Sequence, residues 1–335
     1  MKKQRPIWVI VFGLLLSAYT AYVMMDVFVI KRPMQENVTE INLALFATAT
    51  PTSLPPTPTP NPGGSSSTNP AEPTPTDPPT PTPTPPWFSE EVVATDTLYK
   101  NDHLFVEITH YREHKTDIHV AEVRMTSAQY LLTAFAKDTY GRNILDKPTR
   151  MMKTKDAIFC VNGDNYGARE GGYVIRNGFL YRTVGNSSYK MEVLCIMPDG
   201  DFYFTHSSRE TAQSLLDKGV WQGFTFGPVL LDNGEFKVNP RSEVDLCYVQ
   251  NPRTAIGMVE PLHYFFVVAD GRTEQSYGLS LYQLADFMQR LGCTKAYNLD
   301  GGGSSTMAFR GKVINFPTGD GTYYEREVAD IVYVR

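Results

Sequence analysis

The stretch "YFFVVADGRTEQSYGLSLYQLADFMQRLGCTKAYNLDGGG", residues 264–303, holds the pattern that decides the fold. It begins with "YFFVVADGR" and ends with "KAYNLDGGG", and the apolar part of each is typical of a strand. Between them, Ser280 is suited to cap a helix, apolar residues recur at helical spacing from Leu281 to Leu291, and Gly292 is suited to end it. The order predicts two strands that run parallel, with the helix packed on their sheet.

Strand-like runs also dominate the sequence on either side of this stretch. The runs "LFVEITHY" and "IHVAEVRM", residues 104–111 and 118–125, alternate apolar and polar residues around a short polar segment, which predicts a hairpin. The sequences "RNG", "PDGD" and "DNGE" are tight-turn signals between later runs. We therefore predict an α+β fold, a mixed β-sheet domain with few helices.

The N-terminal region has a different composition. Residues 7–30 form an apolar run interrupted only by Asp26, and a helix needs ~20 apolar residues to cross a bilayer. A cleavable signal peptide is the alternative, but no small-residue cleavage pattern follows, so an uncleaved anchor is favoured. The basic residues before the run, with the amino terminus, favour a cytoplasmic N-terminus. We predict a cytoplasmic tip and a single-pass anchor in the cell membrane over residues 1–32.

A second region of biased composition follows the apolar run. Residues 51–86 alternate Pro with Thr and other small residues, and such a segment forms an extended spacer because it cannot build a core. We predict an extracytoplasmic, disordered Pro/Thr-rich linker over residues 33–86 and one domain over residues 87–335. The net charge of −5 and the pI near 5.7 argue against a nucleic-acid partner.

The four cysteines all lie in apolar, strand-like contexts of this domain. No C-x-x-C pair occurs, which argues against a zinc knuckle. Buried thiols and disulfides both remain open, since a domain outside the cytoplasm permits either. The positions are Cys160, Cys195, Cys247 and Cys293.

Polar residues gather where several strand-like runs end. Each cluster alone is a common turn signal. Together they supply arginines, which suit phosphate or carboxylate, and carboxylates that could act as acids, bases or nucleophiles. The clusters are Asn162-Gly163-Asp164, Asn251-Pro252-Arg253-Thr254, Asp270-Gly271-Arg272 and Asn298-Leu299-Asp300-Gly301-Gly302-Gly303-Ser304-Ser305.

The stretches "VNGD", "NPRTAIG", "VVADGR" and "NLDGGGSS", followed by "GKVINFPTGDGTYYEREVADIVYV", resemble the phosphodiester glycosidase family over about residues 150–335. The resemblance implies a domain that cleaves a GlcNAc-like sugar from a sugar-1-phosphodiester. This chain departs from the family pattern at Asp164-Asn165-Tyr166, where many members have Gly followed by aromatic residues. The matching positions are Asn162, Gly163, Arg253, Thr254, Asp270, Arg272, Asn298, Asp300 to Ser305 and Arg326.

The residue types at these positions fit that chemistry. Cleavage at an anomeric carbon passes through an oxocarbenium-like state that a carboxylate stabilises or attacks. The departing phosphate needs cations and N–H or O–H donors more than a strong acid. We predict catalytic roles for Asp300, Asp270 and Asn162. Substrate or phosphate binding is predicted for Arg253, Arg272, Gly301, Gly302, Gly303, Ser304, Ser305, Asn298, Thr254, Arg326 and Asp164.

The sequence also contains features of competing functions. The sequence "HYREH", residues 110–114, matches a zinc-peptidase pattern that needs a helix, whereas its context predicts a hairpin. No cofactor or metal site is predicted, and a divalent ion stays open. The predicted partner is a carbohydrate phosphodiester in a wall, capsule or exopolysaccharide polymer. The alternatives are a non-catalytic polysaccharide-binding module on the same fold and a phosphodiesterase that cuts P–O.

Overall fold

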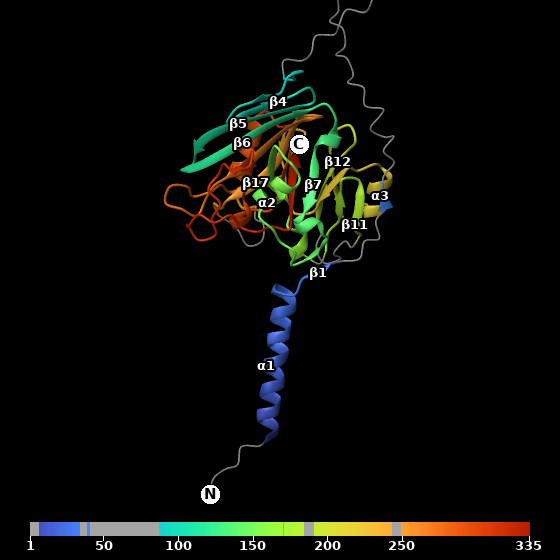
Figure 1. Ribbon diagram of the computed structural model, residues 1–335, viewed down its shortest axis with the longest axis vertical. Coiled ribbons are helices and arrows are strands. Elements are labelled where there is room, and N and C mark those ends of the chain that lie inside the picture. Colours follow the sequence, from blue (N-terminus) through green and yellow to red (C-terminus); the bar gives the residue numbers. More distant parts are fainter. Residues whose placement is uncertain (1–6, 34–38, 41–86, 170, 184–190, 243–248) are drawn as a thin grey trace, which may run out of the picture.

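The computed structural model describes residues 7–33, 39–40, 87–169, 171–183, 191–242 and 249–335. This part of the chain is mostly β-sheet, as predicted, and Figure 1 shows the sheets stacked into one body from which a single long helix emerges. It contains four α-helices, which are α1 (Ile7–Phe28), α2 (Pro148–Thr154), α3 (Ala212–Asp217) and α4 (Leu281–Arg290).

The largest sheet has nine strands, and neighbouring strands pair antiparallel. In sheet order they are β16 (Glu235–Phe236), β15 (Val229–Asp232), β19 (Lys295–Asn298), β17 (Arg253–Glu260), β18 (His263–Ala269), β6 (Thr116–Met125), β5 (Leu104–Glu113), β4 (Leu98–Lys100) and β3 (Val93–Ala94). The predicted hairpin is confirmed, because β5 pairs with β6 from Leu104 opposite Met125 to Glu113 opposite Thr116.

The predicted strand–helix–strand unit of residues 264–303 consists of β18, α4 and β19. Both strands pair antiparallel with β17, which lies between them, so they run in the same direction, as predicted, without being neighbours. Ser280 caps α4 in a capping box with Gln283. Leu284 and Met288 of this helix are buried in one core with Ala255 of β17 and Val267 of β18. The helix therefore covers one face of the sheet.

Two further large sheets belong to the domain. The five-stranded sheet runs β21 (Lys312–Val313), β20 (Met307–Phe309), β9 (Phe159–Asn162), β22 (Asp330–Val334) and β7 (Leu132–Phe135). The six-stranded sheet runs β13 (Phe202–His206), β12 (Glu192–Ile196), β14 (Gln222–Phe224), β10 (Val174–Arg176), β11 (Phe179–Arg182) and β2 (Thr39–Glu40). The main core joins all three sheets, since Phe159, Leu194 and Ile256 are buried together in it.

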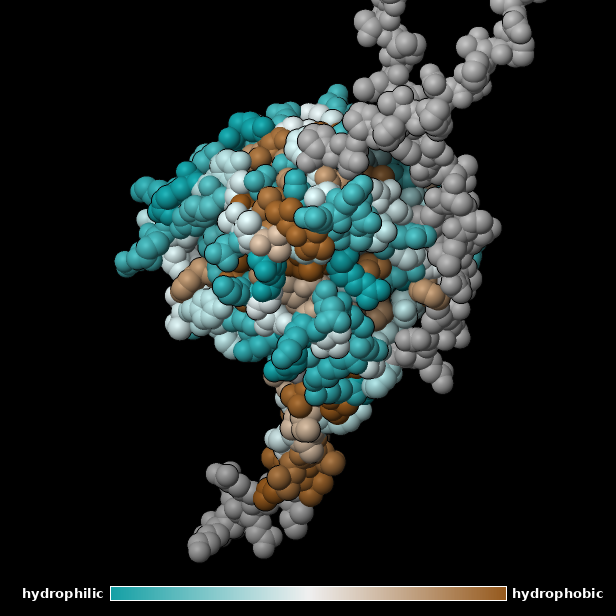
Figure 2. All heavy atoms as spheres, turned by 45° about the horizontal axis from the view of Figure 1, so that its top comes forward, coloured by the Kyte–Doolittle hydropathy of each residue, from teal (hydrophilic) through white to brown (hydrophobic). Residues whose placement is uncertain are grey.

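Helix α1 projects from the domain, which it meets where the Asn143 side chain donates to the Asp26 carbonyl at 3.4 Å. Figure 2 shows its hydrophobic side chains below a mostly hydrophilic surface. Its segment Trp8–Asp26 is long and apolar enough to cross a membrane. Strand β1 (Arg32–Pro33) pairs with β8 (Gly141–Arg142), and β2 pairs with β11. Short pieces of the predicted linker thus join the sheets, whereas residues 41–86 lie outside the described residues.

The structure describes three of the four cysteines and the stretch 110–114. Cys160, Cys195 and Cys293 are buried free thiols, and burial raises the pKa of the Cys293 thiol to about 12. Cys247 lies outside the described residues. The stretch 110–114 belongs to β5 and the turn after it, where His114 has a φ of 51°, so it forms the expected hairpin rather than a zinc-peptidase helix.

Candidate active site

Asp300 follows β19, where the chain leaves the nine-stranded sheet. Its carboxylate accepts a hydrogen bond from the Gly301 amide, at 2.9 Å, and another from the Ser304 hydroxyl. Burial raises the pKa of Asp300 to about 6, while Ser304, Gly301 and the cations Arg326 and Arg169 act to lower it. The residue as a whole is only partly buried. With this pKa, Asp300 is mostly ionised at neutral pH.

Asn162 ties three strand ends together beside Asp300. Its Nδ2 donates to the Asp300 carbonyl at 2.7 Å, although the two residues are 138 positions apart. Its Oδ1 accepts from the Thr254 hydroxyl at 2.8 Å and from the Thr306 amide at 3.1 Å. Three of the predicted site residues, Asn162, Thr254 and Asp300, thus form one hydrogen-bonded group at the junction of β9, β17 and β19.

The glycine run is shaped by close packing. Gly302 has a φ of +60°, and a Cβ on it would lie 2.9 Å from Nη2 of Arg272, so a larger residue would be strained and crowded. Its amide donates to the Pro252 carbonyl at 2.8 Å. Gly303 lies against Arg326, whose Nη1 would be 3.6 Å from a Cβ there. The run thereby brings Arg272 and Arg326 directly onto the backbone beside Asp300.

Asp270 and Arg272 hold a neighbouring loop in place. The Asp270 Oδ1 accepts from the Asn315 side chain and from the Phe316 amide, both at 2.9 Å, and its Oδ2 lies 3.2 Å from His119 Nε2. Arg272 donates to the Gly319 carbonyl at 3.0 Å. Because both Asp270 oxygens have protein partners, this geometry favours a positioning role for Asp270.

Arg253 and Asn298 make contacts away from the Asp300 carboxylate. Arg253 is buried and donates to the backbone carbonyls of Leu279 and Val249. Successive strand residues face opposite sides, so Arg253 lies on the α4 face of β17 while Thr254 faces Asn162. The side-chain amide of Asn298 donates to the Gly227 carbonyl at 2.8 Å.

Asp164 belongs to a buried ionic group with Arg176 and Asp330. Arg176 Nη2 lies 2.7 Å from an Asp164 oxygen and 3.0 Å from Asp330 Oδ2. The other Asp330 oxygen is buried without a hydrogen-bond partner among the described residues. Burial raises the pKa of Asp330 to about 7; Arg176 lowers it, and Asp164 and Asp300 raise it further.

This ionic group touches the site through Gly163. A side chain at Gly163 would clash with the Asp330 carboxylate, and the Gly163 carbonyl accepts from the Asp300 amide at 3.2 Å. Sequence reasoning missed Arg176 and Asp330 because their stretches, "RNG" and "ADIVYV", read as an ordinary turn and strand. The usable signal was a charged residue inside or beside an apolar run, since charge is rarely buried unless paired.

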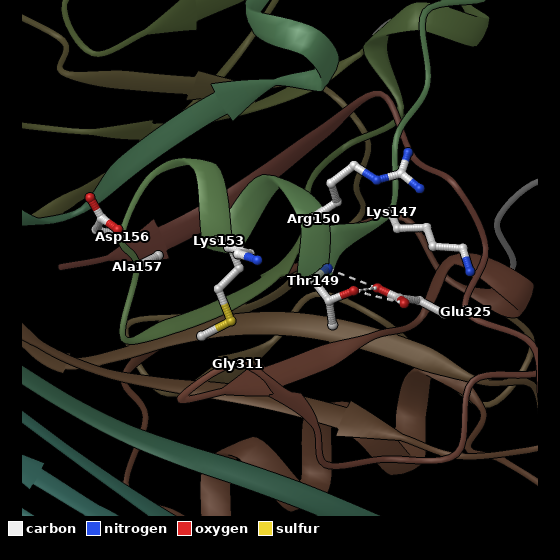
Figure 3. A pocket seen from close by; sticks show the side chains of 9 residues that line it. Lys147, Thr149, Arg150, Lys153, Asp156, Ala157, Gly311 and Glu325 are labelled. Carbon is white, nitrogen blue, oxygen red and sulfur yellow. Dashed lines mark hydrogen bonds between the residues drawn. The ribbon is translucent and has the colours of Figure 1, made fainter.

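A separate hollow of about 720 Å³ lies along α2. Figure 3 shows Lys147, Arg150 and Glu325 toward one end of it and Asp156 toward the other. Glu325 accepts from the Thr149 amide and hydroxyl. None of the predicted site residues lines this hollow. It is therefore separate from the group around Asp300.

Comparisons with known proteins show which family the chain resembles. The family model for phosphodiester glycosidases matches residues 155–335. The SPbeta prophage-derived uncharacterized protein YomE of Bacillus subtilis is 31% identical over 200 residues, which are 58% of this chain and 30% of that protein. The mouse N-acetylglucosamine-1-phosphodiester alpha-N-acetylglucosaminidase is 39% identical over 70 residues, which are 21% of this chain and 13% of the mouse protein. The chain thus spans less than a third of the length of either relative.

A solved structure has a similar fold. The catalytic domain of zebrafish N-acetylglucosamine-1-phosphodiester alpha-N-acetylglucosaminidase, auto-inhibited by its pro-peptide, has a TM-score of 0.55 and 20% identity. The match covers 69% of this chain and 82% of the zebrafish one. Since the family model spans more than half of the sequence and includes the group around Asp300, this chain belongs to the phosphodiester glycosidase family.

Proposed function

We propose that this protein hydrolyses the glycosidic C–O bond of a sugar-1-phosphodiester, with a GlcNAc-like sugar, in a surface or wall polymer. The observation that carries the proposal is the placement of Asp300. The carboxylate of this partly buried residue stands beside Arg326 and Arg169, next to a tightly packed glycine run. Such a site offers a negative group for a developing oxocarbenium ion and cations for a departing phosphate.

Each residue of the group has a role in this proposal. The ionised Asp300 faces the anomeric carbon and either attacks it or stabilises its positive charge. Arg326 and Arg272 neutralise the phosphate, which leaves as an anion, with Ser304 as a hydroxyl donor. Asn162, through its bonds to the Asp300 carbonyl and Thr254, keeps the carboxylate in position. Asp270 and Arg253 act by holding neighbouring backbone segments.

The proposal also covers location. The apolar helix α1 serves as a single-pass anchor with its N-terminus in the cytoplasm, and the domain over residues 87–335 lies outside. Support comes from the length and composition of Trp8–Asp26 and from its exposure along the described helix. A substrate in a surface polymer is then within reach of the domain.

Hydrolysis of a GlcNAc-1-phosphodiester in oxygen-18 water tests the reaction. Attack at the sugar carbon puts the label on the reducing sugar, whereas attack at phosphorus puts it on the phosphate. We expect label on the sugar alone, measured by mass spectrometry of both products. Label on the phosphate would establish the phosphodiesterase alternative, and no turnover across several sugar phosphodiesters would favour the binding module.

A further inference from the structure

We propose that Phe316, Tyr323 and Tyr324, the aromatic rim, bind the saccharide that is esterified to the leaving phosphate. This inference rests on the proposed function and extends it from the scissile bond to the next unit of the polymer. The three residues lie on one loop, residues 315–326, between β21 and β22.

The aromatic rim is exposed to an unusual degree for one short loop. Phe316, Tyr323 and Tyr324 are 42%, 52% and 56% exposed. The rings of Phe316 and Tyr323 meet edge to face with centroids 5.4 Å apart. Single exposed aromatics are common, but several gathered on one loop mark a binding surface. A large part of each of these three residues is therefore in contact with solvent and available to a ligand.

The loop is held rigid by its own hydrogen bonds and by the domain. The Tyr324 amide donates to the Pro317 carbonyl at 2.9 Å, and the Gly321 amide donates to the Thr318 hydroxyl at 2.7 Å. The buried Asp270 carboxylate fixes the Phe316 amide. Rings presented on a pre-organised loop lose little entropy when a ligand binds. Asp270 and Arg272, which both bond to this loop, thereby hold the aromatic rim in position.

The loop also lies beside the site. The Gly319 Cα would be 3.4 Å from a Cβ on Gly303, and the loop ends at Arg326, whose charge acts on Asp300. Arg326 follows Tyr324 by two residues, so the aromatic rim and this cation belong to one short loop. With the sugar carbon at Asp300 and the phosphate at Arg326, the group esterified to that phosphate lies beside the loop that carries the rim.

The chemistry of the rim selects a saccharide for this position. An aromatic ring offers an apolar face and, in tyrosine, a polar edge that stays wet. A pyranose has the complementary form, with C–H groups on its faces and hydroxyls around its edge. Asp320, Thr322 and Glu327 are exposed on or beside the loop and can meet those hydroxyls.

Two diesters of GlcNAc-1-phosphate test the inference on the full chain. One carries a methyl group on the phosphate, and the other carries a methyl hexoside linked through its 6-hydroxyl. For Tyr323→Ala, we expect the ratio of kcat/KM for the hexoside diester to that for the methyl diester to fall about tenfold. Tyr323→Phe keeps the ring and should keep the wild-type ratio.

Tyr282→Ala is the matched control, because Tyr282 is 38% exposed and stacks on Phe236 with centroids 5.2 Å apart, outside the rim. It should leave the ratio unchanged. A ratio that is unchanged in Tyr323→Ala, or that falls equally in Tyr282→Ala, overturns the inference. If the wild type hydrolyses neither diester, the proposed function fails, and saturation-transfer NMR with the methyl hexoside 6-phosphate decides the rim. Transfer present in the wild type and lost in Tyr323→Ala supports it; no difference overturns it.

Discussion

Asp300 is the residue on which the proposed chemistry depends. We expect Asp300→Asn to lower kcat/KM by at least a thousandfold, because the amide keeps the size of the side chain but loses its charge. Steady-state assays on a sugar-1-phosphodiester, with circular dichroism to verify the fold, make the measurement. Ser304→Ala should cost less, about 1–3 kcal/mol of lost hydrogen bonding. Wild-type turnover in Asp300→Asn would reduce Asp300 to a turn residue.

The carboxyl groups of Asp300 and Asp330 also predict how activity depends on pH. Activity that requires ionised Asp300 should fall as pH drops through about 6, where burial places its pKa. Because the pKa of Asp330 lies above that of Asp300, Asp330 is mostly neutral on this acid limb, and Asp330→Asn should leave the limb of kcat/KM where it is. Arg169→Gln removes a cation that lowers the pKa of Asp300, so it should move the limb to higher pH. Identical limbs in the wild type and Arg169→Gln would contradict the assignment of the limb to Asp300.

The same two carboxyl groups bear on stability. Their pKa values in the fold, about 6 and about 7, lie above the unfolded value near 3.8. The fold therefore binds these protons more tightly than the unfolded chain, so their contribution to stability is present below pH 4 and is lost as pH rises toward 7. We expect Asp330→Asn to weaken this decline, measured by urea unfolding at pH 5 and pH 8. An identical decline in the variant would contradict the assignment.

At this scale the sequence revealed the group around Asp300 but not what each polar side chain touches. Asn162, Thr254 and Asp300 stand at strand ends in three separate motifs, and they do meet. Arg253 is in the same motif as Thr254, yet strand alternation turns it toward α4. Arg176 and Asp330 are 154 positions apart, and local patterns carry no information on such a pairing.

At the scale of elements, Gly163 joins the end of β9 to the start of β22. Gly163→Ala should destabilise the domain by about 1–3 kcal/mol, since a Cβ there clashes with the buried Asp330 carboxylate. Thermal unfolding followed by calorimetry measures the loss. Gly319→Ala is the control, because a Cβ on Gly319 meets nothing within 4 Å. Equal melting temperatures for the two variants would contradict the packing argument.

The elements themselves were largely predictable, and their order in the sheets was not. The periodicity of residues 281–291 and the cap at Ser280 identify α4, and alternation identifies the β5–β6 hairpin. The insertion of β17 between β18 and β19 depends on pairing between segments distant in sequence. Periodicity describes each strand and its buried face but not its neighbour.

At the scale of the whole molecule, the domain should fold without the N-terminal region. Trp87 already packs on the domain. The centroid of its ring lies 5.7 Å from that of Phe105, and the Arg124 guanidinium lies 3.9 Å from the centroid of the Trp87 ring. A chain that begins at Trp87 should be soluble and unfold in a single cooperative transition, measured by calorimetry and circular dichroism. Insolubility, or two transitions, would mean that the domain needs the region before Trp87 in order to fold.

The pairing of β1 with the domain has a mechanical consequence. Only residues 29–31 separate α1 from β1, so the pairing of β1 with β8 holds the end of the helix next to the domain. If α1 is the proposed anchor, this short connection keeps the domain close to the membrane surface.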